Sequence, residues 1–216
     1  MSMPVSERTK EMMKRIDEAT GSAPRWRWYH ATAFYVLIQA LTFGLSGLTS
    51  AIKGNRGKSL QEDIFGDTSY FRELKQSIFA PPSWVFGPAW TLNNISVIMG
   101  TWRALNKARD TSGRSAFLAL QGASWINYVL FNAAYFSLRS PINAFVLTLS
   151  MFILTILSGF VAIFRLKDTW VALSLVTLFI WLNIALTAAT FQALWNYDDF
   201  YQVGPFVKAD KRLLKK

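Results

Sequence analysis

Long runs without charged residues alternate with shorter charged segments along the chain. Five such runs, mostly apolar, lie at about 29–52, 84–105, 116–138, 142–164 and 169–195, and Arg103 marks the end of the uncharged part of the second. A helix rises about 1.5 Å per residue, so each run is long enough to cross a hydrocarbon core about 30 Å thick. The pattern therefore predicts an all-α membrane protein, a bundle of five transmembrane helices.

The segments between and beyond these runs complete the predicted organisation. Residues 1–28 mix both charge signs and form an N-terminal surface segment, which precedes the transmembrane domain at 29–196. Residues 53–82 form the longest connection, and its charges and the pair Tyr70-Phe71 favour a lid that packs onto the bundle. Residues 197–216 are a basic C-terminal tail, expected to lie on lipid headgroups or in solvent.

Polar and aromatic side chains recur at helical spacing in two of the runs. In the third run Trp125, Tyr128 and Asn132 fall on one face. In the fifth run Asn183, Thr187 and Thr190 form a second stripe that we expect to face inward. Such stripes serve as contacts between helices or as a wall for a ligand, and both interpretations stay open. The fourth run has few polar residues and is expected to face lipid.

Composition limits the chemistry that these helices can perform. The chain has no cysteine and one histidine, His30, which excludes disulfides, thiolate catalysis and a multi-histidine metal site. The uncharged runs lack the carboxylates and bases that proton relays and nucleophilic catalysis need. We therefore predict no catalytic residues, no metal site and no enzymatic activity. The basic residues that give the chain its net charge of +10 lie beside the apolar runs. This position favours anionic lipid headgroups over nucleic acid as a partner.

The second run begins with a stretch rich in proline and tryptophan, from Phe79 to Thr91. Two adjacent prolines predict an extended entry, after which Ser83 is expected to cap a helix. Pro88 would lie inside that helix and kink it. A rigid aromatic entry of this kind is typical of the wall of a binding site.

This stretch resembles the signature of the TspO/MBR family, the tryptophan-rich sensory proteins and the mitochondrial translocator protein. The residues that carry the resemblance are Pro81-Pro82-Ser83-Trp84-Val85-Phe86-Gly87-Pro88-Ala89-Trp90-Thr91, preceded by Tyr70-Phe71, Leu74 and Phe79. The layout of five runs with a long first loop is also similar to that of the family. The resemblance implies a five-helix bundle, commonly dimeric, with a pocket between the helices beneath the first loop.

The resemblance also implies which residues contact a ligand. Trp84 and Trp90 match the family's pattern, while Asn94 stands in place of a tyrosine. In the third run the family's asparagine and tryptophan fall on Tyr128 and Phe131, and in the fifth its tryptophan and asparagine fall on Asn183 and Phe191. Together with the polar stripe, the predicted ligand-binding residues are Trp84, Trp90, Asn94, Tyr128, Phe131, Asn183, Thr187 and Phe191.

Two functions follow from these patterns. The first is binding of a hydrophobic planar molecule, a porphyrin or haem-like tetrapyrrole, a sterol or a carotenoid, for sensing or transport. The alternative is a non-catalytic accessory subunit of a larger membrane complex, with a degenerate pocket. The expected partners are membrane lipids and a hydrophobic small molecule, with assembly into a homodimer or a larger membrane complex.

Overall fold

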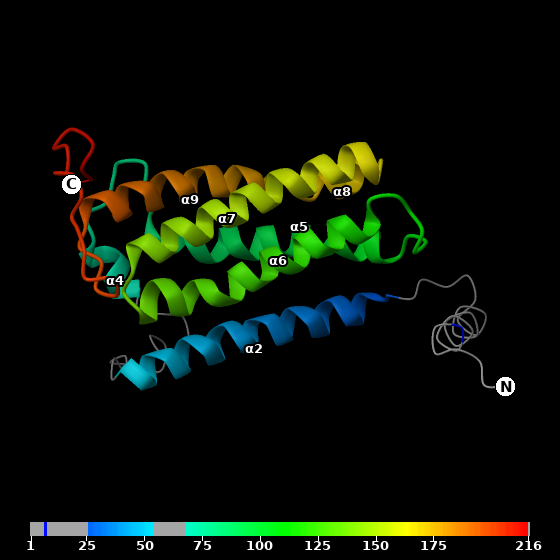
Figure 1. The fold of residues 1–216 in the computed structure, drawn as a ribbon, viewed down its shortest axis with the longest axis horizontal. Coiled ribbons are helices and arrows are strands. Elements are labelled where there is room, and N and C mark those ends of the chain that lie inside the picture. The colour runs from blue at the N-terminus through cyan, green and yellow to red at the C-terminus, as the bar shows by residue number, and fades with distance from the viewer. Residues whose placement is uncertain (1–6, 8–25, 54–67, 216) are drawn as a thin grey trace.

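Five long helical segments form one bundle in the computed structural model, which describes residues 7, 26–53 and 68–215 (Figure 1). Most of the predicted N-terminal surface segment and the first part of the lid lie outside the described residues. The long segments are α2 (Trp28–Lys53), α5 (Phe86–Leu105), α6 (Arg114–Asn132) with the π-helical turn η2 (Ala133–Ser137), α7 (Pro141–Phe160) with the π-helical turn η3 (Val161–Arg165), and α8 (Thr169–Leu173) with α9 (Val176–Trp195). Two short elements precede α5, namely α4 (Thr68–Glu73) and the 3₁₀ turn η1 (Ser83–Val85). The predicted all-α five-helix bundle is confirmed.

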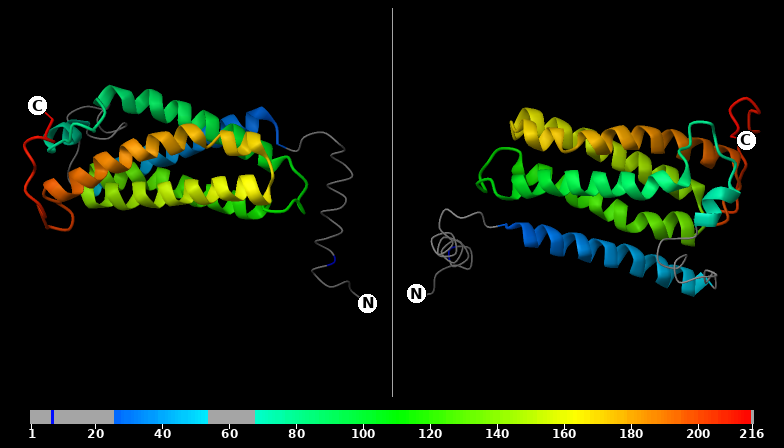
Figure 2. Two further views of the ribbon diagram at one scale, coloured as in Figure 1. Left: turned by 90° about the horizontal axis from the view of Figure 1, so that it is seen from above. Right: turned by 180° about the vertical axis from the view of Figure 1, so that it is seen from behind.

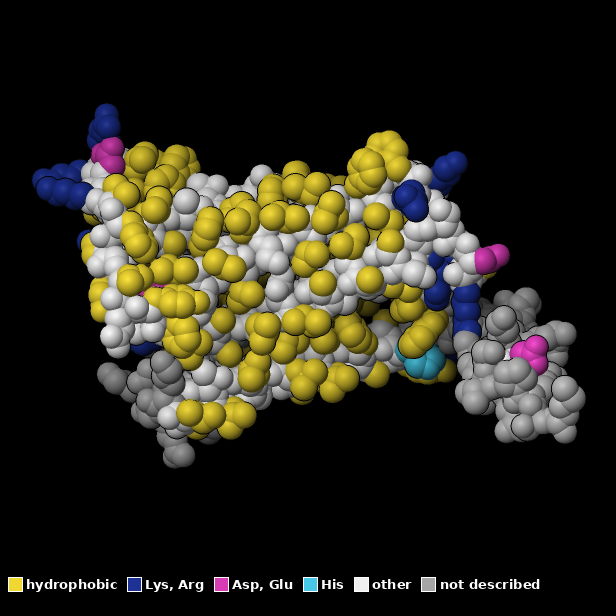
Figure 3. Space-filling view, viewed as in Figure 1, with side chains coloured by type: hydrophobic (Ala, Val, Ile, Leu, Met, Phe, Trp, Pro, Cys, Tyr) yellow, Lys and Arg dark blue, Asp and Glu magenta, His cyan; other side chains and the backbone are white. Residues whose placement is uncertain are grey.

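The surface of the bundle has the pattern of a membrane protein. Among the described helices, Trp28–Ile52, Pro141–Arg165 and Thr169–Trp195 are long and apolar enough to cross a membrane. Helices α5 and α6 have 20 and 19 residues, and their mean hydropathy is lowered by amides that they bury, such as Asn93, Asn94 and Gln121. Hydrophobic side chains cover the middle of the face shown in Figure 3, and charged side chains gather at the two ends.

The fifth segment is interrupted where α5 approaches it most closely. A Cβ atom at Gly100 would lie 1.9 Å from Ser174 Oγ, so only glycine allows this contact. Ser96 Oγ donates to the Ser174 carbonyl at 2.7 Å, and Ser174 Oγ donates to the Val171 carbonyl at 2.7 Å. These bonds accompany the turn between α8 and α9, where the sequence predicts one continuous helix.

Pro88 lies at the start of α5 and not in its interior, contrary to the prediction. The residues after the double proline form the 3₁₀ turn η1, so α5 begins at Phe86 and Pro88 lies in its first turn. Amides in the first turn of a helix have no partner within the helix, so proline removes no bond there. Ser83 makes no side-chain capping bond, since Pro82 occupies the position before η1.

The fourth run does not simply face lipid, as the sequence predicts. Helix α7 packs against α6 and α9, and one of its faces buries Ala144, Thr148, Met151, Thr155 and Ser158. Apart from Met151 these residues are small or polar, and they follow a spacing of three and four, which allows neighbouring helices close approach. The large apolar residues occupy the opposite face. Helix α7 therefore has two different faces, which its mean hydropathy does not reveal.

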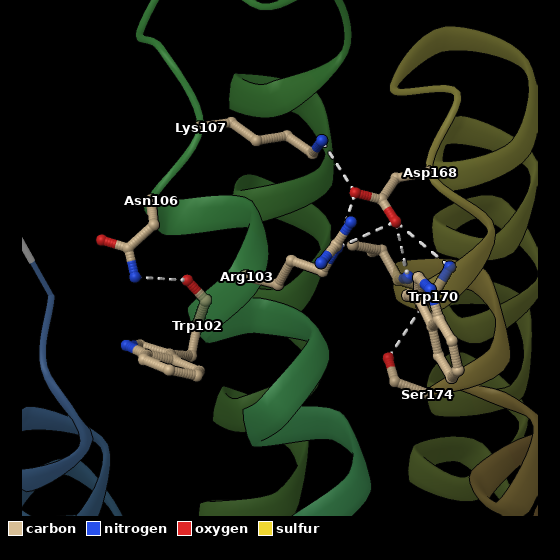
Figure 4. A network of polar contacts seen from close by, with 8 residues as sticks. Trp102, Arg103, Asn106, Lys107, Asp168, Trp170 and Ser174 are labelled. Atoms are coloured by element: carbon tan, nitrogen blue, oxygen red, sulfur yellow. Dashed lines mark hydrogen bonds and ion pairs between the residues drawn. The ribbon is translucent and has the colours of Figure 1, made fainter. Parts of the chain in front are cut away.

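A buried carboxylate ties the ends of three helices together, as Figure 4 shows. Asp168 is 5% exposed and accepts bonds from Arg103 Nε at 2.8 Å and Lys107 Nζ at 2.7 Å. It also caps α8 by accepting from the amides of Trp170 and Val171. Burial alone would raise the pKa of Asp168, but the bonds from Lys107 and Arg103 and from the Val171 amide outweigh it and lower this pKa to about 2.

We predict that Asp168→Asn lowers the free energy of unfolding by about 1–3 kcal/mol at pH 7, because two cations lose their counter-charge. The folded-state pKa lies below the ordinary value of 3.8, so the carboxylate stabilises the fold above about pH 4. That contribution, about 2 kcal/mol, disappears as the pH falls to about 2. Thermal unfolding of both proteins in detergent at several pH values checks this, and equal midpoints at pH 7 would contradict it.

Candidate functional site

A cavity of about 270 Å³ lies inside the bundle, bounded by α2, η1, α5, α6, η2, α7 and α9. Apolar and aromatic side chains form most of its surface, and it extends up to Phe71 of α4. Its lining residues include Phe86, Trp90, Tyr128, Phe131, Tyr135, Met151, Trp181, Leu182, Ala188 and Gln192. Sites for small molecules have this character, with few polar groups among hydrophobic walls.

Edge-to-face contacts hold the aromatic wall in place. The Trp90 ring lies 5.3 Å from Tyr128 and 6.4 Å from Trp181, measured between centroids. Phe86 meets the same Trp181 ring at 5.3 Å, at an interplanar angle of 87°. Such T-shaped pairs fix ring orientation beyond simple burial, so three helix segments present a rigid surface to the cavity.

The first of two polar stations in the cavity wall is the Tyr128 hydroxyl. Asn94 Nδ2 of α5 donates to it at 3.0 Å, and Gln39 Nε2 of α2 donates at 3.2 Å. One hydroxyl thus joins α2, α5 and α6. Without water, each of these amides needs a protein partner, and the arrangement gives both of them one.

The second polar station connects the cavity to the lid. Tyr135 Oη donates to Gln192 Oε1 at 2.8 Å, and Gln192 Nε2 donates to Gln76 Oε1 at 2.8 Å. Tyr135 and Gln192 line the cavity, whereas Gln76 belongs to the connection before α5. A polar group in this part of the cavity would therefore meet side chains that also hold the lid.

Four of the predicted ligand-binding residues lie at the cavity. Trp90, Tyr128 and Phe131 line it directly. Asn94 does not line it but is buried behind Tyr128 and bonded to that hydroxyl. The structure thus brings this half of the predicted set together.

The other four predicted residues lie outside the cavity. Trp84 is 74% exposed because η1 turns its side chain away from the bundle. Asn183 and Thr187 are exposed on the outer face of α9 and bond to backbone carbonyls of their own helix. Phe191 stacks on Phe79 and lies tilted against Trp195 instead of lining the cavity. The inward stripe predicted for the fifth run was therefore wrong.

The face of α9 that does turn inward begins at Trp181. Trp181, Ala185, Ala188 and Gln192 line the cavity and recur at positions i, i+4, i+7 and i+11, the spacing of one helical face. A helical face with small residues between a tryptophan and a glutamine is the sequence pattern that could have identified this inward face of α9. Asn183 and Thr187 were expected on the inner face because polar residues of a membrane helix usually point inward.

The TspO/MBR family pattern matches residues 36–196 of the chain, a range that includes most of α2 and the whole of the other four helical segments. The chain belongs to the TspO/MBR family. It is accordingly a multi-pass membrane protein of a family whose members generally bind, sense or transport ligands. A comparison with curated proteins gave no match.

The described part of the lid, residues 68–82, is fixed to the end of this TspO/MBR bundle by Arg139. Its guanidinium pairs with Glu73 of α4 at 2.6 Å and with Asp199 at 2.9 Å. It also lies over the Tyr70 ring, 4.4 Å from the centroid. Burial, followed by the Asp199 carboxylate, raises the pKa of the Tyr70 hydroxyl well above its usual range, so it stays neutral.

The C-terminal tail pairs with the lid, although most of its side chains stay exposed. Residues 197–215, here called the strap, fold back along the lid, as the red trace in Figure 1 shows. Ile78 N donates to the Leu213 carbonyl and Lys215 N to the Gln76 carbonyl, both at 2.8 Å. Lys215 Nζ also reaches the Ala80 carbonyl at 3.0 Å. The strap therefore pairs with the lid just before the double proline.

We predict that Lys215→Pro loosens the lid, because it removes an amide donor and an ammonium donor together. Hydrogen exchange of the amides at 76–80 should become about 10-fold faster. Lys211→Pro is the matched control, since Lys211 follows Asp210 in a turn closed by Leu213 N and proline is favoured there. Unchanged exchange in Lys215→Pro, or an equal rise in both variants, would contradict the prediction.

Proposed function

We propose that this TspO/MBR protein binds a planar apolar molecule between its helices, for sensing or transport. The observation that supports this most strongly is the cavity between the helices, walled by Phe86, Trp90 and Trp181. Flat aromatic walls favour flat ring systems, because large faces meet without leaving gaps.

The two polar stations suggest the ligand's shape. Tyr128 and Tyr135 are seven residues apart on one helical segment, which corresponds to about 10 Å along its axis. A rigid ring system with polar groups near both edges could reach both hydroxyls. Tetrapyrroles of the porphyrin or haem type fit this pattern best, and sterols and carotenoids fit the apolar walls.

The size of the cavity limits which ligands it can hold without a change in its walls. Its 270 Å³ lies just below the range of about 300–1,000 Å³ that is typical of sites for drug-sized ligands. A tetrapyrrole would therefore need the wall to move. The lid is the part of the wall held by hydrogen bonds rather than by membrane-spanning packing, so we propose that it yields when the ligand enters. An accessory role in a larger complex stays a prediction of the sequence.

We predict that Trp90→Ala weakens binding of protoporphyrin about 10- to 100-fold, because a large buried ring surface is lost. The purified protein in lipid nanodiscs would be titrated while the porphyrin's own absorbance is followed. Trp84→Ala is the matched control, since Trp84 is an exposed tryptophan outside the cavity.

Saturable binding that is weakened by Trp90→Ala and unaffected by Trp84→Ala is the expected result. Absence of saturation in the natural protein would contradict a tetrapyrrole ligand. Equal weakening in the two variants would contradict the cavity as its site.

A further inference from the structure

The polar atoms in the cavity wall belong to hydroxyls, amides and indoles. Every described residue that lines the cavity is uncharged at neutral pH. The amides come from Asn132 and Gln192, and the phenol hydroxyls from Tyr128 and Tyr135. A molecule that enters the cavity therefore exchanges its water for aromatic rings and neutral hydrogen-bonding groups, and the described part of this wall supplies no counter-charge.

Two side chains of the wall have hydrogens left for a ligand. Tyr128 Oη already accepts from Asn94 and Gln39. Its own hydrogen points to Gln39 Oε1 across 3.4 Å, which is longer than the usual distance of about 2.7–2.8 Å between two oxygens. Asn132 lies one turn later and lines the cavity, and its side chain makes no hydrogen bond with the described residues. Because an amide offers two N–H donors, Tyr128 and Asn132 together suit an acceptor such as a carbonyl oxygen.

The charged groups near the lid end of the cavity do not favour an acid either. Helix α4 and the strap lie at this same end of the bundle, as both views in Figure 2 show. Arg139 lies 4.4 Å from the centroid of the Tyr70 ring, and that ring lies 5.7 Å from the ring of Tyr135 in the cavity wall. The guanidinium pairs with two carboxylates, those of Glu73 and Asp199. These three side chains together carry a net negative charge, which repels an anionic group at this edge of a ligand.

A carboxylate and a carbonyl differ in what they lose when they leave water. A carboxylate loses a strong hydration that one or two neutral donors do not replace, unless a cation is close. A carbonyl oxygen loses much less, and the hydrogens of Tyr128 and Asn132 can replace it.

We propose that the cavity selects planar molecules whose polar groups are uncharged acceptors, such as ester or ketone carbonyls, over free acids of the same ring system. This selectivity rests on the proposed function, since it defines the ligand class of the same cavity. For a tetrapyrrole, it means that the esterified form is the preferred ligand.

The test compares protoporphyrin, which carries two carboxylates, with its dimethyl ester, which has the same ring system and two ester groups in their place. Each compound is titrated at about pH 7.5 into the full chain in nanodiscs of zwitterionic lipid, and uptake by empty nanodiscs is subtracted. We expect the ester to bind at least about 10-fold more tightly. Trp90→Ala should weaken binding of both compounds, because Trp90 forms part of the cavity wall.

A cation introduced into the wall should reverse the preference. Asn132→Lys supplies a counter-charge, so we expect the free acid to gain at least about 10-fold relative to the ester. Asn132→Met is the matched control, because methionine has a similar length and no charge, and this variant should still favour the ester. Saturable binding of the ester checks that each variant is folded, and the natural protein alone decides the selectivity where a variant does not fold.

The outcomes separate the selectivity from the proposed function. Equal binding of the two compounds by the natural protein, or tighter binding of the free acid, would overturn the selectivity and leave the proposed function standing. An unchanged ratio in an Asn132→Lys variant that still binds the ester would also contradict the selectivity. No saturation with either compound would instead overturn the proposed function, and the selectivity with it.

Discussion

A hydrocarbon environment offers no hydrogen bonds, so each amide and hydroxyl on a spanning helix must find a partner in protein. The Tyr128 hydroxyl is where this constraint has the greatest effect. It takes bonds from Asn94 on α5 and Gln39 on α2, and so fixes how three helices are rotated against one another. The rotation of α5 that buries Asn94 also places Trp90, one turn earlier, in the cavity wall. The shape of the site thus follows from the satisfaction of buried amides.

The same constraint links the cavity to the end of the bundle. Gln192 accepts from Tyr135 inside the cavity and donates to Gln76 in the lid. The strap in turn bonds to the backbone of Gln76 and Ile78. A change in the hydrogen bond between Tyr135 and Gln192 would therefore alter the contacts of lid residues outside the membrane. For a family of binding and sensory proteins, such a chain of contacts is a physical route from an apolar site to an aqueous surface, although its coupling energy has to be measured.

The sequence was sufficient for the fold and for half of the site. Uncharged runs and the double-proline stretch predicted the bundle, because length, charge and proline geometry act locally. Trp90 and Tyr128 were found because the motif and the helical spacing agreed on them. Asn183 and Thr187 were misplaced because periodicity shows which residues share a face but not which way that face turns. The rotation of α9 depends on close packing against α7 and α5, and the position of the strap depends on contacts with residues more than 100 positions away, which no local pattern contains.

The most direct test of the cavity as a binding site is the small molecule that the protein retains from its native membrane. The measurement is mass spectrometry of an organic extract of the gently purified protein, compared with Ala188→Phe. Ala188 is buried and lines the cavity, so a phenyl ring there would fill the space while Trp90 and both polar stations remain. We predict close to one planar apolar molecule per chain in the natural protein and almost none in Ala188→Phe. Equal amounts in the two proteins, or bilayer lipids alone in both, would contradict it.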